Sequence, residues 1–224
     1  MIETNKQEIG DDIRRSATAI ALIEAGIDQF GLYGQKATTR NVAEHANANI
    51  AAIPYYFRSK NGLYNACMHY IVDEIWAQIG DQLSNASQNI EDLNQAQASQ
   101  RYLAIMEAFC QFFLQDPDTL RWSQFVMREH ATPTQAYEIF YQRYYQHAQS
   151  LKVKLLSVCL GKYYDEKRLK VISHALFGQA LGFLLARESL LRGLGIEELS
   201  TDDVKLISDV VTQNVRSVLV NPTL

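Results

Sequence analysis

Apolar residues that recur every three or four positions are the feature that most limits what this chain can fold into. No stretch of any length alternates apolar and polar residues as a half-buried strand would, and the chain holds only four prolines. Amphipathic helices of this kind bury their apolar faces against one another. The sequence therefore predicts an all-α fold of about nine helices. Two long C-terminal stripes carry the pattern: Leu169, Ile172, Leu176, Ala180, Phe183, Arg187 and Leu190, then Val204, Ile207, Val211, Val215 and Val218.

Capping residues divide the N-terminal part into helices. Asp11 or Asp12 is placed to cap the first helix, and Gly31 and Gly34 lie where that helix should end. Ser59 is placed to cap a longer helix. Two short helices are expected before it, at about 39–46 and 50–57. The polar run from 84 to 99 is interpreted as a loop or a frayed helix start.

Two prolines mark helix starts in the middle of the chain. Asp116 and Pro117 fit the N-cap and the first helical position, and Thr132 and Pro133 repeat the arrangement. The helix after Pro133 is expected to be long. It is expected to end at Leu160 and Gly161. The next helix is expected to start at a cap on Asp165 and to end at about Arg192. The last helix is expected to start at a cap on Ser200 or Thr201 and to close at Asn221-Pro222.

Composition excludes several classes of protein. The formal net charge is −4, so the chain as a whole is no polyanion binder. Three widely separated cysteines, Cys67, Cys110 and Cys159, argue against a disulfide scaffold or a zinc site. The polar start is unlike a secretory signal, and no apolar run approaches the ~20 residues of a membrane span. We therefore expect a cytoplasmic globular protein without a metal or another cofactor.

The stretch "TTRNVAEHANANIAAIPYYFRSK", from Thr38 to Lys60, predicts a helical hairpin. Val42 of the first short helix is expected to face Ile53 and Phe57 of the second. Asn47 is one of the few non-glycine residues suited to the left-handed conformation that such a turn requires, and Asn49 can cap the second helix.

The outward residues of this hairpin fit a DNA groove. They combine small apolar groups with tyrosine hydroxyls at the N-terminal end of a helix, and the window from 34 to 60 carries four basic residues and one acid. The alternative is a plain helical hairpin whose tyrosines pack in an all-α core. Spacing alone leaves both interpretations open.

Residues 13–75 resemble the DNA-binding domain of the TetR family of transcriptional regulators. The segment "ATTRNVAEHANANIAAIPYYFRSKNGLY" is similar to that family's signature nearly position by position. The segments "MREHATPTQAY" and "HALFGQALGFLLARESLL" resemble, more loosely, the CecR-like subgroup. The resemblance implies a three-helix DNA-binding head at 1–58 and a helical ligand-binding and dimerisation domain at 59–224, linked by a fourth helix that starts at 59.

The resemblance also implies which residues contact DNA. Arg40 and Asn49 would reach base edges or phosphates, and sequence reading would otherwise depend on thymine methyl groups and DNA shape. Two positions depart from the family pattern: Asn47 stands where glycine is common, and Pro54 lies inside the second short helix. The remaining expected contacts are Ile50, Ala51, Ala52 and Pro54 in the groove, and Thr39, Tyr55, Tyr56 and Lys60 at phosphates.

Two further sites are expected in the C-terminal part. The last two long helices can form half of an intersubunit four-helix bundle, or they can pack only within the subunit. Gly178 and Gly182 could serve either arrangement. The dimer residues predicted are Leu176, Phe183, Ile207, Val211 and Val215. A small aromatic or amphipathic effector is expected near Phe109, Phe113, Trp122, Phe125, Tyr144 and Arg187, although most of these aromatics should be ordinary core.

Catalysis is not expected. The five histidines show no metal spacing, and Glu129 and His130 are adjacent, so their side chains diverge on a helix. We predict a homodimeric, ligand-responsive transcriptional regulator, most simply a repressor, that binds a double-stranded operator. A helical protein-binding adaptor without DNA binding is the alternative, and salt-dependent binding to duplex DNA would separate the two.

Overall fold

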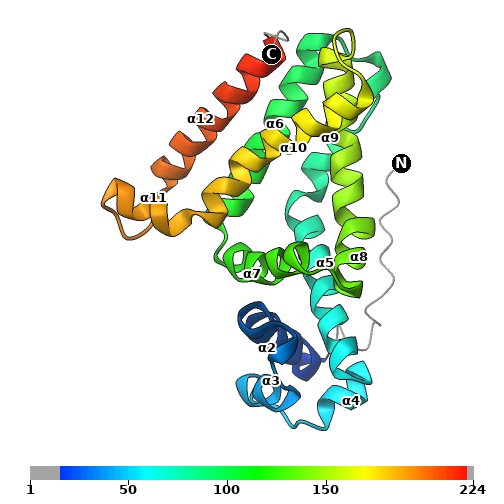
Figure 1. Cartoon of the computed structure of the whole chain (residues 1–224), viewed down its shortest axis with the longest axis vertical. Helices are drawn as coiled ribbons and strands as arrows, with labels where there is room; N and C mark the ends of the chain where they lie inside the picture. Colours follow the sequence, from blue (N-terminus) through cyan, green and yellow to red (C-terminus); the bar gives the residue numbers. More distant parts are fainter. Residues whose placement is uncertain (1–15, 221–224) are drawn as a thin grey trace. The chain divides into compact units, whose positions relative to one another are not determined.

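The computed structural model describes residues 16–220 (Figure 1). Within this range the chain forms helices and turns, with no strand, which confirms the all-α prediction. Contacts between residues divide the chain into two compact units. Unit 1 contains residues up to 77 together with 121–145, and unit 2 contains 78–120 together with 146–224. This division differs from the boundary expected at 58 and 59, because α7 and α8 group with the N-terminal helices.

Unit 1 is built around α2, which runs from Ala17 to Tyr33. Leu22, Ile27 and Phe30 of α2 are buried and form its inner face. The other elements are η1 (Gly34–Lys36), α3 (Thr39–His45), α4 (Ala52–Phe57), the first part of α5 (Lys60–Ala86), most of α7 (Pro117–Ala131), α8 (Gln135–Phe140) and a π-helical turn (Tyr141–Tyr145).

The ends of α2 follow local capping rules. The Ser16 hydroxyl oxygen accepts a hydrogen bond from the Ala19 amide, 3.3 Å away, and Gly34 ends the helix at φ 58°. A positive φ strains residues with a Cβ atom, so glycine suits this position. The predicted end is confirmed. The predicted caps Asp11 and Asp12 lie outside the described residues.

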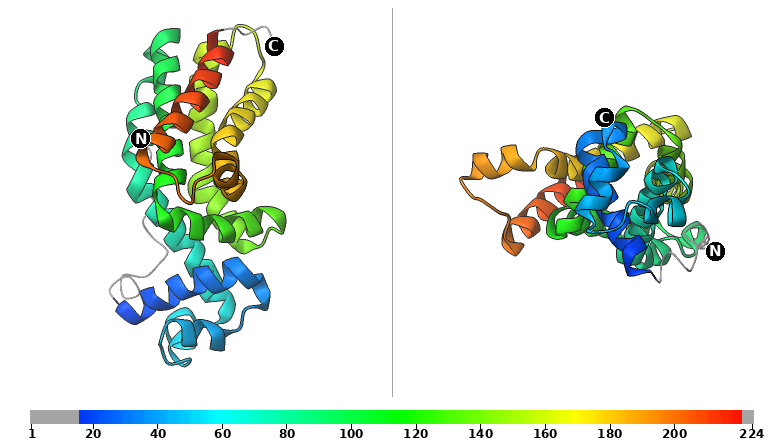
Figure 2. Two further views of the ribbon diagram at one scale, coloured as in Figure 1. Left: turned by 90° about the vertical axis from the view of Figure 1, so that its left-hand side faces the viewer. Right: turned by 90° about the horizontal axis from the view of Figure 1, so that it is seen from below.

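Unit 2 is a helical bundle with α6 (Gln95–Gln115) packed against α9 (Gln146–Leu160), α10 (Glu166–Leu185) and α12 (Thr201–Val220) (Figure 2). Short elements complete it: the end of α5, η2 (Ile90–Asp92) and α11 (Arg187–Leu194). Tyr102 and Phe109 of α6, Leu155 of α9 and Val215 of α12 are buried in its core. Within the described range no single helix is long and apolar enough to cross a membrane, although the bent pair of α10 and α11 passes that test together.

Most predicted boundaries in the second half of the chain are confirmed where they fall on described residues; the predicted close at Asn221-Pro222 lies outside them. Asp116 caps α7 through a 2.8 Å bond from the Asp118 amide, and Asp165 caps α10 through a 2.8 Å bond from the Arg168 amide. Ser200 caps α12, because its hydroxyl oxygen accepts from the Asp203 amide at 3.2 Å.

Three boundaries were predicted wrongly. The cap of α8 is Thr134 rather than Thr132, since the Thr134 hydroxyl oxygen accepts from the Ala136 amide at 3.2 Å. The polar run 84–99 is a loop only from 87 to 94, because α5 continues to Ala86 and a reciprocal capping box of Asn94 and Gln97 starts α6 at Gln95. Finally, α10 ends at Leu185 and α11 follows it, so the chain has more helical segments than expected.

Candidate nucleic-acid interface

Helix α3 and the turn that follows it have the geometry predicted for a helix-turn-helix. The Thr38 hydroxyl oxygen accepts a hydrogen bond from the Asn41 amide at 3.1 Å and caps the helix. Asn47 is left-handed, with φ 49°, and the Ala48 amide donates to the Ala43 carbonyl at 2.9 Å. A left-handed residue lets the following amides close over the last turn of a helix. Asn47 therefore does what glycine does elsewhere, as expected.

Pro54 does not distort α4. It is the third residue of that helix, within the first turn, where backbone amides have no partner inside the helix in any case. The Ile50 carbonyl, which an amide at 54 would use, accepts from the Ile53 amide at 3.2 Å. Asn49 supports the same turn, because its Oδ1 accepts from the Ala51 amide at 2.9 Å. The loss of ~3 kcal/mol that proline causes in a helix interior therefore does not apply here.

The predicted inner and outer faces of the hairpin are correct. Val42, Ile53 and Phe57 are buried. Ile50 and Tyr55 are 48% and 79% exposed, although both are large apolar or aromatic residues. Arg40, Asn49, Ala51 and Pro54 are also exposed, whereas Thr39, Ala52, Tyr56 and Lys60 are half-buried.

Two of the half-buried residues already have partners within unit 1. The Ser16 hydroxyl donates to the Tyr56 hydroxyl oxygen at 2.8 Å, which ties α4 to the start of α2. The Lys60 ammonium donates to the Gln35 carbonyl at 2.5 Å, which ties α5 to η1. These two side chains therefore hold the hairpin in place.

The exposed positive charge includes two residues that the predicted contacts did not contain. Lys36 and Arg58 are exposed near the hairpin, and Arg58 ends α4 in a left-handed conformation at φ 66°. A non-glycine residue at positive φ is uncommon and is favoured at functional turns. Arg58 follows directly on the "YYF" sequence, and its basic character was the available signal.

The part of α7 that belongs to unit 1 binds α2 through two arginines. The Arg121 guanidinium pairs with the Asp28 carboxylate through two bonds, at 2.8 and 3.1 Å. The Arg128 guanidinium donates to the carbonyls of Gly31 and Leu32, at 3.0 and 2.9 Å, where the last carbonyls of α2 lack partners. Nothing in the local sequence predicts these contacts, because the paired residues lie more than 90 positions apart.

A buried carboxylate of α7 links this helix to α5 and to the start of α8. Glu129 is 1% exposed, and its oxygens accept from the Tyr64 hydroxyl at 2.7 Å and from the Thr134 hydroxyl at 2.8 Å. The amides of Thr134 and Tyr137 donate to it as well, both at 3.0 Å. Burial is the largest cause that raises the pKa of the Tyr64 hydroxyl, and the hydrogen bond to the Glu129 carboxylate raises it further. Tyr64 therefore stays protonated and remains a donor to Glu129.

The predicted effector residues do not form one cluster. Phe125 lies in the core of unit 1 against Phe30 and Tyr64, and Tyr144 is buried there beside Trp76. Trp122 is also buried in unit 1. The remaining three, Phe109, Phe113 and Arg187, belong to unit 2.

In unit 2, Phe113 and Arg187 line one hollow of about 620 Å³, here called the α6–α10 hollow. Its apolar lining comes from the end of α6, α10 and the start of α12, and its charged lining is Arg187 with Asp116 and Glu198. Phe109 lies behind Phe113, with ring centroids 5.7 Å apart.

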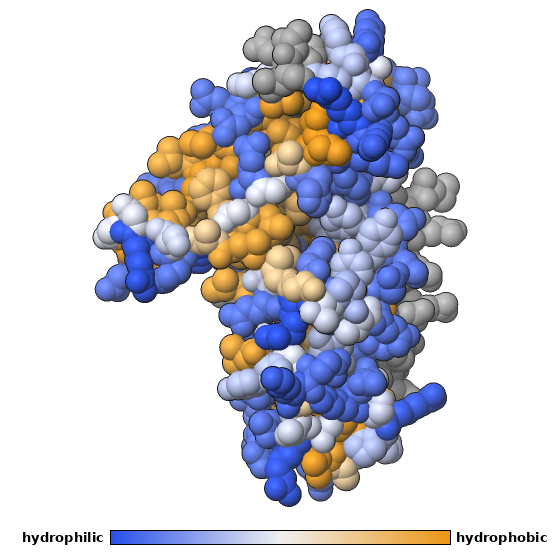
Figure 3. All heavy atoms as spheres, viewed as in Figure 1, coloured by the Kyte–Doolittle hydropathy of each residue, from blue (hydrophilic) through white to orange (hydrophobic). Residues whose placement is uncertain are grey.

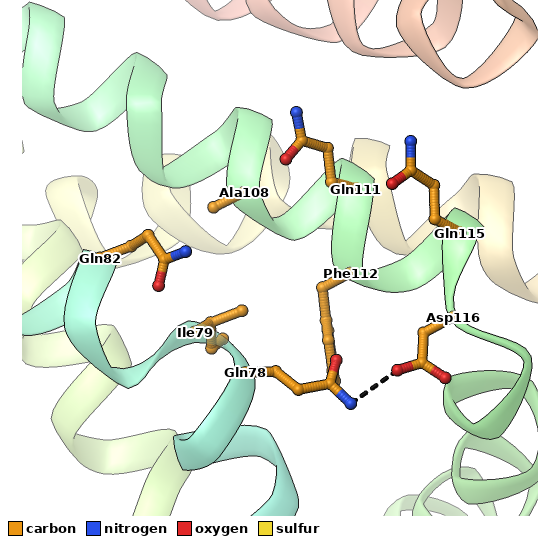
Figure 4. A pocket seen from close by; sticks show the side chains of 8 residues that line it. All are labelled: Gln78, Ile79, Gln82, Ala108, Gln111, Phe112, Gln115 and Asp116. Atoms are coloured by element: carbon orange, nitrogen blue, oxygen red, sulfur yellow. Dashed lines mark hydrogen bonds between the residues drawn. The ribbon is translucent and has the colours of Figure 1, made fainter. Parts of the chain in front are cut away.

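A second hollow in unit 2, of about 460 Å³, lies between the end of α5 and α6 and is here called the glutamine hollow (Figure 4). Gln78 and Gln82 come from α5, Gln111 and Gln115 come from α6, and Ile79, Ala108 and Phe112 lie between them. The Gln78 amide donates to the Asp116 carboxylate at 2.6 Å. This lining offers hydrogen bonds and one acid but no base, so it disfavours anions. The sequence analysis did not predict this hollow.

The predicted dimer residues lie mostly in the core of unit 2. Leu176, Ile207, Val211 and Val215 are between 0% and 7% exposed, and Phe183 is half-buried. The cause is that α12 packs against α6 along this stripe. Four of the five residues are therefore buried within the subunit itself.

The hairpin, its rigid attachment to α2 and its exposed polar and basic residues define a helix-turn-helix protein. A family profile described as "Bacterial regulatory proteins, tetR family" matches residues 22–67, and one described as "HTH-type transcriptional dual regulator CecR, C-terminal domain" matches residues 98–220. The transcriptional dual regulator CecR of Shigella flexneri is 34% identical over 200 residues, which cover 88% of this chain and 89% of that protein. The chain therefore belongs to the TetR family of transcriptional regulators and carries the CecR-type C-terminal domain.

Solved structures have the same fold. A TetR-like transcriptional regulator from Rhodococcus sp. RHA1 aligns with a TM-score of 0.60 at 16% identity, covering 91% of this chain and 96% of that chain. FadR from Bacillus subtilis, in complex with stearoyl-CoA, aligns with a TM-score of 0.57 at 9% identity, covering 88% and 96%. As a member of this family, the chain is a regulator of transcription rather than an enzyme.

Proposed function

We propose that this regulator binds a pseudo-palindromic operator as a homodimer in the cytoplasm and represses transcription until a small-molecule effector releases it. The observation that carries the DNA part is the exposed surface of the hairpin. Arg40, Asn49 and Tyr55 point away from a well-packed unit, so a DNA groove can reach them without rearrangement. Exposed Lys36 and Arg58 add charge for the phosphates beside that groove.

Within this interface we assign different roles to the predicted residues. Arg40 and Asn49 read base edges, and Ile50, Ala51 and Pro54 present apolar groups to thymine methyls. Tyr55 contacts phosphate. Tyr56 and Lys60 act chiefly by holding the hairpin, because their polar atoms already have partners within unit 1.

The proposed dimer seam is an exposed stripe on α10 and α12, on the other side of these helices from the core residues (Figure 3). On α10 the stripe is formed by Val171, Ala175, Gly178, Gly182 and Leu185, at alternating spacings of four and three. On α12 two apolar side chains four positions apart, Leu206 and Val210, are exposed. Such spacing is typical of helices that pack side by side, and an exposed apolar stripe of this length favours a partner.

Two glycines in this seam support a second copy of the chain as the partner. A Cβ atom built on Gly178 or Gly182 would meet nothing within 4 Å, so packing inside the subunit does not require glycine there. Each glycine costs about 1 kcal/mol in a helix interior relative to alanine. Close approach of a partner helix would account for both.

The effector part of the proposal is supported by the two hollows of unit 2. FadR, a structural neighbour, was solved with stearoyl-CoA, so this fold can enclose an amphipathic ligand. By analogy, we assign the effector of this regulator to unit 2.

The test is selection of binding sites from random duplex DNA by the purified protein, followed by transcription in vitro from a promoter that carries the selected site. We expect a pseudo-palindrome with half-sites about 34–36 Å apart or somewhat more, and reduced transcription when protein is added. Recovery of no symmetric site would refute the operator proposal. Increased transcription would refute repression while leaving DNA binding intact.

A further inference from the structure

Lys152 of α9 is the one charged side chain that is fully buried in unit 2, among the residues that the structure describes. It is 2% exposed. Its ammonium lies 3.8 Å from the centroid of the Phe177 ring and 5.6 Å from that of the Phe109 ring. Cation–π contacts of this kind compensate only part of the lost hydration.

No described carboxylate pairs with Lys152, and burial alone lowers its pKa to about 7. On the helices packed against α9, the titratable side chains Glu107 of α6, His174 of α10 and Asp209 of α12 are exposed. Buried charges in proteins are normally paired. Lys152 is therefore a positive group without its partner.

A second buried donor lies between the same helices. The Tyr102 hydroxyl of α6 is fully enclosed and near Ser173 of α10, yet it makes no hydrogen bond of normal geometry with any described residue. Buried polar atoms without partners are few in native structures, and each calls for an explanation. An ammonium and a hydroxyl in one three-helix interface both require an acceptor.

The α6–α10 hollow adjoins this interface. Phe113 lines the hollow, and its ring lies 5.7 Å from both Phe109 and Phe177, the two rings beside the Lys152 ammonium. Phenylalanine rings thus lie between the hollow and the buried ammonium. Within this layer Phe177, which is half-buried, is the ring nearer to the Lys152 ammonium.

We propose that Lys152 is the counter-charge for a monocarboxylic effector, whose apolar body lies in the α6–α10 hollow and whose carboxylate reaches the ammonium between α6, α9 and α10. This inference rests on the proposed function, because it names the chemistry of the effector. It selects this hollow over the glutamine hollow because Arg187 lines this one, beside Asp116 and Glu198, whereas the glutamine hollow has no basic residue in its lining.

The proposal makes the binding of an acid dependent on a proton. Above pH 7 the free protein holds Lys152 largely neutral, and a bound carboxylate favours its charged form. The acid therefore binds together with a proton taken from solution. A neutral amide of the same shape has no charge to pair, so its binding takes up none.

The test is calorimetric titration of the full-length protein at pH 8 in phosphate and in Tris, two buffers with different heats of ionisation. The probes are octanoate, decanoate and 4-phenylbutyrate, each compared with its own amide. We expect uptake of about one proton per subunit for an acid that binds, and none for the amides. Failure of all three acids to bind, or binding without proton uptake, would overturn the proposal.

Three variants locate the charge. Lys152→Met should weaken acid binding about tenfold or more and abolish proton uptake. Lys154→Met changes an exposed lysine on the same helix and should alter neither. Arg187→Gln should leave proton uptake intact. Loss of acid binding in Arg187→Gln, with Lys152→Met unaffected, would move the carboxylate to Arg187 and refute the assignment.

Operator titrations separate this inference from the proposed function. If the acids bind with proton uptake but leave operator affinity unchanged, the proposed release of operator DNA by an effector is refuted, and the carboxylate site at Lys152 is supported. If a compound releases operator DNA equally from the wild type and from Lys152→Met, release by an effector is supported and the proposed role of Lys152 is refuted.

Discussion

Replacing Lys152 by methionine should stabilise the protein, and by an amount that depends on pH. Methionine keeps the length and apolar stem of lysine but removes the charge. In the folded state the pKa of Lys152 is lowered from 10.5 to about 7 by burial. One unit of pKa corresponds to 1.36 kcal/mol, so the buried lysine costs roughly 4 kcal/mol at neutral pH. The lost cation–π contacts offset about 1–2 kcal/mol of the gain.

The sign of the pH dependence follows from proton counting. Between pH 7 and 10.5 the unfolded chain binds a proton at Lys152 that the folded chain does not, so wild-type stability rises with pH. Below pH 7 both states are protonated and the full cost is present. The advantage of Lys152→Met should therefore be nearly constant from pH 6 to pH 7, and should then fall by about 2 kcal/mol by pH 9.

Urea unfolding followed by circular dichroism, at fixed protein concentration and at several pH values from 6 to 9, measures this difference. Lys154→Met is the matched control, and an exposed substitution should change stability by less than about 0.5 kcal/mol at every pH. Parallel stability curves for the wild type and Lys152→Met would refute the argument, because they would mean that the buried lysine keeps its ordinary pKa.

Arg40→Ala should lower operator affinity by about 1–3 kcal/mol and relax sequence preference in a binding-site selection, and an unchanged preference would remove Arg40 from base reading. Leu206→Glu should give a monomer of unchanged helix content in sedimentation and circular dichroism, whereas Val211→Glu should unfold unit 2, because Val211 is 1% exposed. Gly62→Ala should destabilise unit 1, since its Cβ would lie 1.9 Å from the Phe57 carbonyl oxygen. Gly178→Ala should leave subunit stability equal or higher but weaken the dimer, and an unweakened dimer would place the seam elsewhere.

Local chemistry made the hairpin and most helix ends predictable. Asn47, Ser59 and Asp165 act on backbone groups within a few residues of themselves, so their roles can be read from a short window. The contacts that attach α7 to α2 could not be predicted in this way. Arg128 binds carbonyls 96 and 97 positions away, and no periodic pattern encodes that distance.

The burial of the predicted dimer residues was not foreseen because α10 has two apolar stripes. The inner stripe is Leu169, Ser173, Leu176, Ala180 and Leu184, and the outer stripe begins two residues later at Val171. Both have helical spacing, so periodicity shows that the helix is covered on more than one side but not which side faces its own core. Lys152 was missed for a related reason: a lone lysine in an apolar run is usually exposed, and only packing shows that it is not.

In the proposed dimer, the separation of the two stripes on α10 affects the choice of subunit partner. Val171, Gly178 and Leu185 can change without disturbing the inner stripe, so a duplicated gene could acquire a new pairing surface while its product still folds. A side chain larger than glycine at 178 or 182 would hold a helix of the parental type at a greater distance, and would thus act as a steric barrier to mixed subunits. Related regulators in one cell could in this way keep their subunits apart, each pair with its own operator.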